Sequence, residues 1–301
     1  MRIWKQAQDL SNSVHCLSNG DICIYEKGPE ILQIFGPPFG CGTVAGLSIA
    51  GEGYSAESER VRRTNTWKHT LFRREKKIGT ITDFVSPAQN VFVREMDLTE
   101  GMEWKIDLAQ SAVFAGEDAA ILPKGSVIYM EYPSRKDTAI VFFADRGKIQ
   151  GGRVQIPEGR SVFWAASAET VAEARKILES AIKHSASLIR KESEQDWEKY
   201  ISRIQVSPRK DAEDLERLLA TVEDVAVLIR SQQSREGSVL AGYNYHLGYV
   251  RDQFGSFRCL MKLHLYPEAQ KILTFYRDVY QKTKQLHNAQ ASGVTGVFHV
   301  H

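Results

Sequence analysis

One segment of the sequence concentrates side chains suited to binding a polar ring. Between positions 242 and 252 lie three tyrosines, His246 and the adjacent pair Arg251 and Asp252. Aromatic faces can cover the apolar C–H face of a sugar, whereas charged groups hydrogen-bond its hydroxyls. Arg251 and Asp252 together offer donors and acceptors, so they could hold neighbouring hydroxyls from both sides. The segment therefore predicts a carbohydrate-binding subsite.

The same residues also admit a purely structural interpretation. Asp252 would lie in the first turn of a helix, where the helix dipole favours a negative charge, and Arg251 could simply pair with it. Tyrosines at a junction between a loop and a helix often only pack against their neighbours. Composition alone leaves both interpretations open.

The order of residues 245–252 adds a resemblance to a known family. Their sequence, Tyr-His-Leu-Gly-Tyr-Val-Arg-Asp, resembles without a gap the Tyr-His-Leu-Val-Trp-Pro-Arg-Asp segment of bacterial glucoamylases and glucodextranases, glycoside hydrolase family 15. That family has a β-sandwich, a long linker helix and then an (α/α)6 barrel whose early loop carries Arg-Asp. Residues 82–87, Thr-Asp-Phe-Val-Ser-Pro, are similar to a Thr-Asp-Phe-Met-Pro segment of trehalase-like members. The resemblance implies an exo-acting glycosidase that cleaves α-glucosidic bonds with inversion and takes an α-glucoside or oligosaccharide.

The resemblance also implies roles for five residues. Arg251 and Asp252 would bind the outer hydroxyls of the non-reducing-end glucose in subsite −1. Tyr245 would lie near the anomeric centre and stabilise the oxocarbenium-like transition state. Tyr249, which stands where the family has Trp, would line the wall of the subsite. His246 matches a histidine of some members, and the resemblance gives it no defined role.

No catalytic residue is predicted in this chain. An inverting glycosidase needs two carboxyl groups about 6.5–9.5 Å apart, and in the family both are glutamates on later loops of the barrel. Twelve barrel helices need about 200 residues, so residues 211–301 correspond to an incomplete, N-terminal part of the barrel. We expect the general acid and base beyond residue 301 and expect this chain alone to be inactive on maltose, isomaltose and trehalose.

Two other classes of function remain open. The chain could be a non-catalytic carbohydrate-binding or scaffold protein, or it could belong to a disaccharide phosphorylase of related (α/α)6 architecture. If the chain binds sugar and Arg251→Ala abolishes that binding, the chain is a sugar-recognising protein and not only a scaffold. Phosphate dependence of a full-length chain would separate a phosphorylase from a hydrolase.

The positioning elements begin with a predicted antiparallel β-sandwich over residues 1–166. Asn19 and Gly20 predict a tight two-residue turn that joins strands at 14–17 and 22–25. A second hairpin is expected around residues 99–101, between strands at 91–94 and 104–108. Further strands are expected at 43–49, 61–67, 70–74, 80–84, 127–131, 138–143 and 161–165.

Helical periodicity replaces the strand pattern after Ala166. Thr170 and Glu173 form a capping-box pattern, which predicts the start of one linker helix within residues 167–210. Within residues 211–301, the spacing of apolar residues predicts helices at 215–233 and 250–265, and Pro267 predicts the start of a further helix. Their apolar stripes are wide, so we expect self-association or a partner through the helical faces.

Composition excludes several other classes. Of the 301 residues, 39 are Lys or Arg and 37 are Asp or Glu, and this balance argues against a nucleic-acid-binding protein. The basic stretch 60–77 could form a nucleic-acid groove, but a solvated strand face is favoured. No apolar run reaches the roughly 18 residues of a membrane span.

Cysteine usage and the first residues bear on location and cofactors. The four cysteines show no metal-ligand spacing, and residues 1–9 lack the apolar core of a secretory signal. We therefore expect a cytoplasmic protein. His299 and His301 alone would make a poor metal site, so no metal and no cofactor are predicted.

Overall fold

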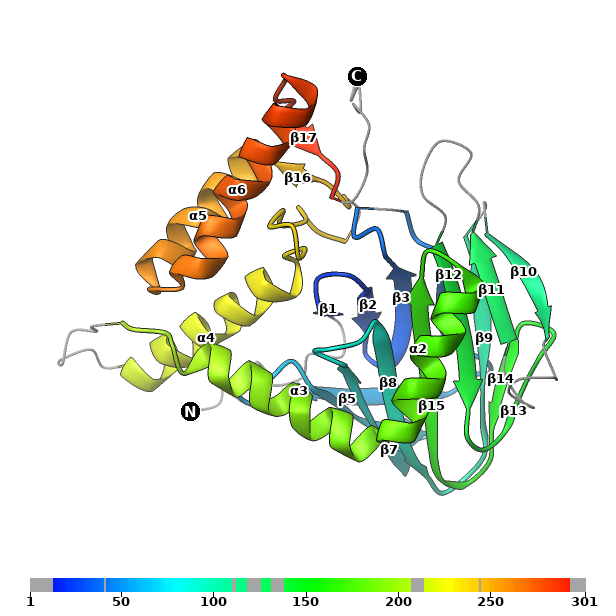
Figure 1. Cartoon of the computed structure of the whole chain (residues 1–301). Coiled ribbons are helices and arrows are strands. Elements are labelled where there is room, and N and C mark those ends of the chain that lie inside the picture. The colour runs from blue at the N-terminus through cyan, green and yellow to red at the C-terminus, as the bar shows by residue number, and fades with distance from the viewer. Residues whose placement is uncertain are drawn as a thin grey trace.

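The computed structural model describes residues 13–40, 42–109, 112–117, 126–130, 138–206, 214–243 and 245–292. Strands occupy most of the first half of the chain and helices most of the second (Figure 1). The strands are β1 (Val14–Ser18), β2 (Cys23–Lys27), β3 (Glu30–Phe35), β4 (Ala45–Ile49), β5 (Tyr54–Arg60), β6 (Trp67–Arg73), β7 (Lys76–Val85), β8 (Val91–Leu98), β9 (Met102–Leu108), β10 (Ala112–Glu117), β11 (Ser126–Met130), β12 (Thr138–Ala144), β13 (Lys148–Gln150), β14 (Arg153–Ile156), β15 (Gly159–Ala168), β16 (Gly248–Tyr249) and β17 (Ala289–Gln290). The helices are α2 (Val171–His184), α3 (Ala186–Ile201), α4 (Leu215–Ser231), α5 (Val250–Lys262) and α6 (Tyr266–Thr283).

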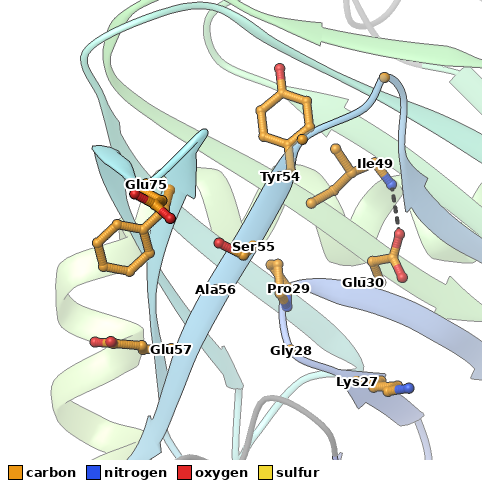
Figure 2. A pocket seen from close by; sticks show the side chains of 13 residues that line it. Lys27, Gly28, Pro29, Glu30, Ile49, Tyr54, Ser55, Ala56, Glu57 and Glu75 are labelled. Atoms are coloured by element: carbon orange, nitrogen blue, oxygen red, sulfur yellow. Dashed lines mark hydrogen bonds between the residues drawn. The ribbon is translucent and has the colours of Figure 1, made fainter.

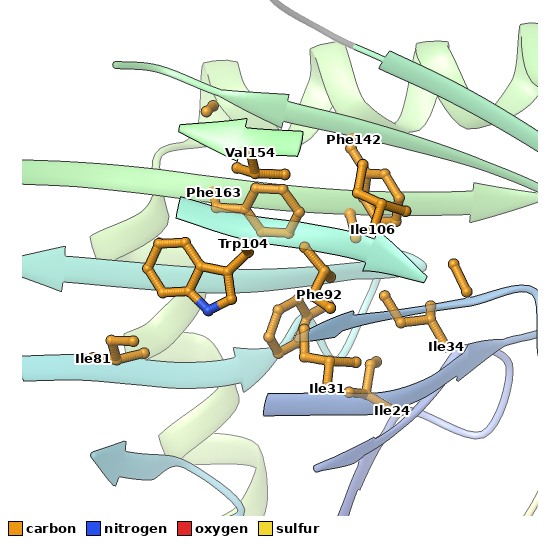
Figure 3. Close-up of a cluster of buried hydrophobic side chains, with 14 of the residues drawn as sticks. Ile24, Ile31, Ile34, Ile81, Phe92, Trp104, Ile106, Phe142, Val154 and Phe163 are labelled. Carbon is orange, nitrogen blue, oxygen red and sulfur yellow. The ribbon is translucent and has the colours of Figure 1, made fainter. Parts of the chain in front are cut away.

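Two large antiparallel sheets form the sandwich. Within the described ranges, one sheet has the order β1-β2-β3-β4-β9-β14-β13 and the other has β10-β11-β12-β15-β8-β7-β6-β5. Alternating burial explains the strands: along β9, Met102, Trp104 and Ile106 are buried, whereas the side chains between them are more exposed. Trp104 belongs to the same buried cluster as Phe92, Phe163 and the isoleucines of β2 and β3 (Figure 3). The predicted antiparallel sandwich is confirmed.

The first predicted hairpin is present, but its turn differs from the prediction. β1 pairs with β2 in a register that places Ser18 opposite Cys23. The connecting loop therefore contains four residues, and the predicted two-residue turn is wrong. Asn19 Oδ1 accepts hydrogen bonds from the backbone N–H groups of Asp21 (3.0 Å) and Ile22 (3.2 Å), so the asparagine side chain organises a wider loop.

Two other strand predictions are wrong. Strands β8 and β9 do not pair: β8 lies between β7 and β15, whereas β9 lies between β4 and β14 in the other sheet. Residues 99–101 therefore carry the chain from one sheet to the other. The strand predicted at 61–67 is instead the turn between β5 and β6, closed by a hydrogen bond from Val61 N–H to Thr66 O (2.8 Å).

The helix start predicted at Thr170 is confirmed. Thr170 Oγ1 accepts from the N–H of Glu173 at 3.3 Å and donates to its carboxylate at 3.0 Å. The prediction of a single linker helix is wrong, because α2 and α3 are separate helices that meet at Ser185. Ser185 has φ 71° and ψ 146°, a conformation that interrupts helical hydrogen bonding.

Helices α2 and α3 face different neighbours. Ala174, Leu178 and Ala181 of α2 pack on the outer face of the sheet that contains Trp164. Trp197 of α3 instead joins the hydrophobic cluster of the later helices. The pair thus connects the two parts of the chain while α2 covers the sandwich.

The predicted helices α4, α5 and α6 are present and share one buried cluster. Ala226, Leu260, Ala269 and Ile272 lie at its centre. Their other faces expose large apolar side chains, namely Leu218, Val225, Leu228, Val250, Phe254, Met261, Tyr266, Leu273 and Tyr280. Within the described residues, no helix is both long and apolar enough to cross a membrane.

Ion pairs join the helices to the sandwich. Arg60 pairs with Asp224 of α4, and Arg63 Nη1 lies 2.9 Å from Glu223 Oε1. Arg235 Nε lies 2.6 Å from Asp21 Oδ2 of the β1–β2 loop. Part of the basic stretch 60–77 is therefore neutralised by acidic residues of α4.

Candidate functional site

The segment that carries the predicted sugar-binding residues leads from α4 into α5. Gly248 and Tyr249 form β16, which pairs with Ala289 and Gln290 of β17. The hydroxyl of Tyr276 on α6 donates to Gly248 O at 3.3 Å. The segment is therefore held from two sides immediately before the helix that bears Arg251 and Asp252.

Two residues that sequence reasoning missed fix this loop. Gln253 is buried, and its amide pairs with both backbone groups of Val239: Oε1 accepts from the N–H at 3.0 Å, and Nε2 donates to the carbonyl. Gly248 leaves no room for a side chain, because a Cβ there would lie 2.2 Å from Ser238 Oγ. The sequence did carry a signal for Gly248, because it has a glycine at the position where the family segment has valine.

Three of the five predicted residues, Arg251, Asp252 and Tyr245, are exposed, and Tyr249 is half-buried. The Arg251 side chain is 90% exposed and that of Asp252 is 44% exposed, with Nε and Oδ1 3.8 Å apart. Tyr245 is 59% exposed, and its ring meets the ring of Tyr249 edge to face, with centroids 6.2 Å apart. An aromatic pair and a charged pair, both accessible to a ligand, thus lie within eight successive positions.

His246 lies apart from those four residues and contacts the sandwich. Its ring stacks on Phe35 with centroids 3.8 Å apart and an interplanar angle of 19°. Its Nε2 forms a 2.9 Å hydrogen bond with Gln33 Oε1. These contacts give His246 a clear structural role, which is to dock the loop on β3.

A separate open pocket of about 740 Å³ lies on the sandwich. It includes Tyr54 and Glu57 of β5 and Glu30 at the start of β3 (Figure 2). Glu30 Oε1 accepts a hydrogen bond from the backbone N–H of Ile49 at 3.2 Å. None of the five predicted sugar-binding residues lines this pocket.

A buried polar cluster occupies the sandwich interior. It contains His15 of β1, Glu26 of β2, His69 of β6, Asp83 of β7 and Arg94 of β8. Arg94 donates to both oxygens of Asp83, at 2.9 Å from Nε and 2.7 Å from Nη2. Burial lowers the pKa of His15 to about 4, and burial also raises the pKa of Glu26. Sequence reasoning did not bring these residues together.

Candidate metal ligands fall into two groups. His299 and His301 lie outside the described residues. Among the described residues, His15, Glu26 and His69 form the one group whose ligand atoms converge, all within 4.8 Å of one another.

Comparisons with known proteins give a fold but no family. No protein-family model and no curated protein matches the chain. A bacterial glucoamylase solved in complex with acarbose aligns with a TM-score of 0.69 and 9% identity, covering 94% of this chain and 52% of that chain. A family 92 glycosyl hydrolase aligns with a TM-score of 0.47 and 9% identity over 77% of this chain and 41% of that chain, too weak a likeness to support an argument.

The glucoamylase alignment confirms the predicted order of a sandwich followed by helices. The chain spans about half the length of that enzyme. At such low identity the likeness concerns the fold alone: two antiparallel sheets followed by helices.

Proposed function

We propose that this chain is the sugar-recognising part of a glucoamylase-type glycoside hydrolase of family 15. The whole enzyme would release glucose from the non-reducing end of α-glucans with inversion. In this proposal, α4, α5 and α6 belong to the first part of an (α/α)6 barrel, and the general acid and base lie outside this chain. We further propose that the protein acts in the cytoplasm.

The observation that carries the proposal is the coincidence of motif and fold. The chain aligns over 94% of its length with a glucoamylase, and the family-like segment 245–252 stands directly at the start of α5. The sequence resemblance rests on the side chains of eight residues, whereas the structural likeness rests on the course of the backbone over 94% of the chain.

The proposal assigns Arg251 and Asp252 to the outer hydroxyls of a glucose unit. Both side chains are exposed and lie in the first turn of α5, so neither is committed to a buried ion pair. Tyr245 and Tyr249 would supply an apolar wall. His246 would act indirectly, by fixing the loop on β3.

Calorimetric titration with acarbose tests this assignment. We expect the wild-type chain to bind acarbose and Arg251→Ala to weaken binding by about 10-fold or more, because a charged hydrogen bond contributes about 1.5–3 kcal/mol. Arg277→Ala is the matched control, since Arg277 and Asp278 form a similar exposed Arg-Asp pair on α6. Equal loss in both variants, or no binding by the wild type, would contradict the assignment.

The pocket on the sandwich favours one second candidate, a non-catalytic carbohydrate-binding protein. Tyr54 and Phe72 provide aromatic surface there, and Glu30, Glu57 and Glu75 provide acceptors for hydroxyls. Loss of acarbose binding in Tyr54→Ala but not in Arg251→Ala would favour this candidate.

A further inference from the structure

We propose that the free edge of β5 binds an extended segment of a partner protein that carries lysines or arginines, by strand addition. β5 is the last strand of its sheet, and among the described residues it pairs with β6 alone. Alternate backbone N–H and C=O groups of an edge strand point away from its neighbour and can pair with another chain. This interaction is a function of the sandwich that is separate from sugar recognition by residues 245–252.

β5 keeps the regular geometry that strand addition requires. All 7 residues of the strand pair with β6 without a shift of register, and the strand contains no proline and no lysine. Natural edge strands are commonly protected from further pairing by prolines, lysines or bulges. β5 has none of these three devices, so its edge can accept another strand.

The open pocket on the sandwich lies along this edge. Residues 54–57 line it from β5, and residues 27–29 line it from the turn between β2 and β3 (Figure 2). Gly51 and Gly53 also line it, and glycines allow another backbone to approach closely. At about 3.3 Å per residue, residues 54–57 offer roughly 13 Å of strand edge to an incoming segment.

The charges that line the pocket favour a basic partner. The lining contains three carboxylates, those of Glu30, Glu57 and Glu75, and one ammonium group, that of Lys27. Glu57 and Glu75 are exposed, and neither forms an ion pair within the described part of the chain. Lysine or arginine side chains of a bound segment would therefore meet carboxylates that have no charged partner.

Two arginines near the edge do not neutralise these carboxylates, because each already has an acidic partner. Arg73 Nη1 lies 3.0 Å from Glu100 Oε1. Arg60, at the end of β5, pairs with Asp224 of α4. The excess of negative charge beside the first half of β5 is therefore available to a ligand.

The two faces of β5 determine the sequence pattern of the partner. Ser55, Glu57 and Glu59 are exposed, whereas Tyr54 and Ala56 are half-buried against the core. Side chains of an added strand also alternate between the two faces. Basic residues would therefore lie opposite Glu57, and small apolar residues opposite Ala56. The matching segment alternates lysine or arginine with residues such as valine.

The same charges disfavour a second copy of this chain as the partner. Antiparallel pairing of β5 with itself about Glu57 would place this glutamate opposite its own copy. Pairing about Ser58 would place Glu57 opposite Glu59 of the copy. Like charges directly opposite each other destabilise a strand pair, so the edge selects a basic segment over self-pairing.

The test is an NMR titration of the isotope-labelled chain with the synthetic peptide Lys-Val-Lys-Val-Lys, with Glu-Val-Glu-Val-Glu as the control peptide. We expect the lysine peptide to bind at least about 5-fold more tightly than the control. It should also slow hydrogen exchange at every second amide of β5, because only the amides directed away from β6 gain a partner.

A charge reversal locates the binding site. Glu57→Lys should weaken binding of the lysine peptide by about 5-fold or more and strengthen binding of the glutamate peptide. Glu198→Lys is the matched control, because Glu198 is an exposed glutamate of α3 outside the pocket, and it should bind both peptides as the wild type does. Unchanged affinities in Glu57→Lys, or binding without alternating protection along β5, would overturn the proposal. So would a natively folded wild type that binds neither peptide or binds both equally.

Discussion

The tight packing behind Gly248 provides a prediction that can be worked through in detail. The change is Gly248→Ala, which adds a Cβ 2.2 Å from Ser238 Oγ and 2.9 Å from Gln253 Nε2. Non-bonded heavy atoms are normally about 3.5 Å apart. The loop and the Ser238 hydroxyl must therefore separate by about 1 Å, which strains both β16 and the clamp made by Gln253.

Overpacking of this kind typically costs about 1–3 kcal/mol of unfolding free energy. The clash can be removed from the other side, because Ser238→Ala deletes the offending oxygen. Ser238 Oγ is buried without a hydrogen-bond partner among the described residues, so its removal should be close to neutral. The double variant should recover at least about 1 kcal/mol of the loss in Gly248→Ala.

Urea denaturation of the four proteins in this cycle measures the coupling. Gly255→Ala is the control, since a Cβ at Gly255 in α5 would meet no atom within 4 Å. Alanine should stabilise that helical position by about 0.5–1 kcal/mol. Because Tyr249 follows Gly248 directly, Gly248→Ala should also weaken acarbose binding. A stable Gly248→Ala, or a double variant with no recovery, would refute the packing argument.

Three further predictions concern the sandwich and the helical faces. Arg94→Met should reduce the free energy of unfolding by about 3–5 kcal/mol in chemical denaturation, because it leaves the Asp83 carboxylate buried without its partner. Ser48→Ala should raise the pKa of Asp107: burial opposes ionisation of that carboxyl, but hydrogen bonds from Lys105 and Ser48 hold its pKa below the ordinary value of 3.8. The stability that this lowered pKa contributes is present above pH 3.8 and is lost as the pH falls through the folded-state pKa, which an NMR titration of the carboxyl carbon can follow. The exposed helical faces should cause self-association in light scattering, and Leu273→Lys should reduce it.

Controls separate these effects from general damage. Arg160→Met alters an exposed arginine 3.5 Å from Asp97 and should change stability by less than about 1 kcal/mol. A similar small loss in Arg94→Met would contradict the role of the buried pair. An unchanged Asp107 titration in Ser48→Ala would show that Ser48 does not contribute. A strictly monomeric wild type at high concentration would contradict the self-association.

Local signals in the sequence predicted the parts of the fold that depend on local chemistry. Alternating burial, as along β9, and helical stripes, as in α4, follow directly from periodicity. The cap at Thr170 was predicted from residues that are neighbours in sequence. The pairing of the strands was harder to predict, because the residues around 99–101 gave no sign that the chain passes from one sheet to the other there.

The turn at Asn19 shows how a small local error hid a long-range feature. A two-residue turn would place His15 opposite Ile24, whereas the observed register places it opposite Glu26. The asparagine side chain widens the loop, and the shift brings a histidine and a carboxylate together. Their meeting with His69 depends on sheet packing, which no local pattern records.

The candidate sugar-binding residues could be proposed from the sequence, but which of them contacts the sandwich could not. Arg251, Asp252 and Tyr245 are exposed and Tyr249 is half-buried, which is compatible with the sugar-binding interpretation. His246 packs on Phe35 of a strand more than two hundred positions earlier. Its orientation depends on how the helices dock on the sandwich, so its position in the segment could not reveal it.

The central claim, that residues 245–252 recognise sugar, is tested most directly by NMR titration of the isotope-labelled chain with acarbose. We predict that the largest amide shifts cluster in residues 245–252 and the first turn of α5, and that they disappear in Arg251→Ala. Shifts confined to the pocket around Tyr54, or no shifts at saturating acarbose, would contradict the claim.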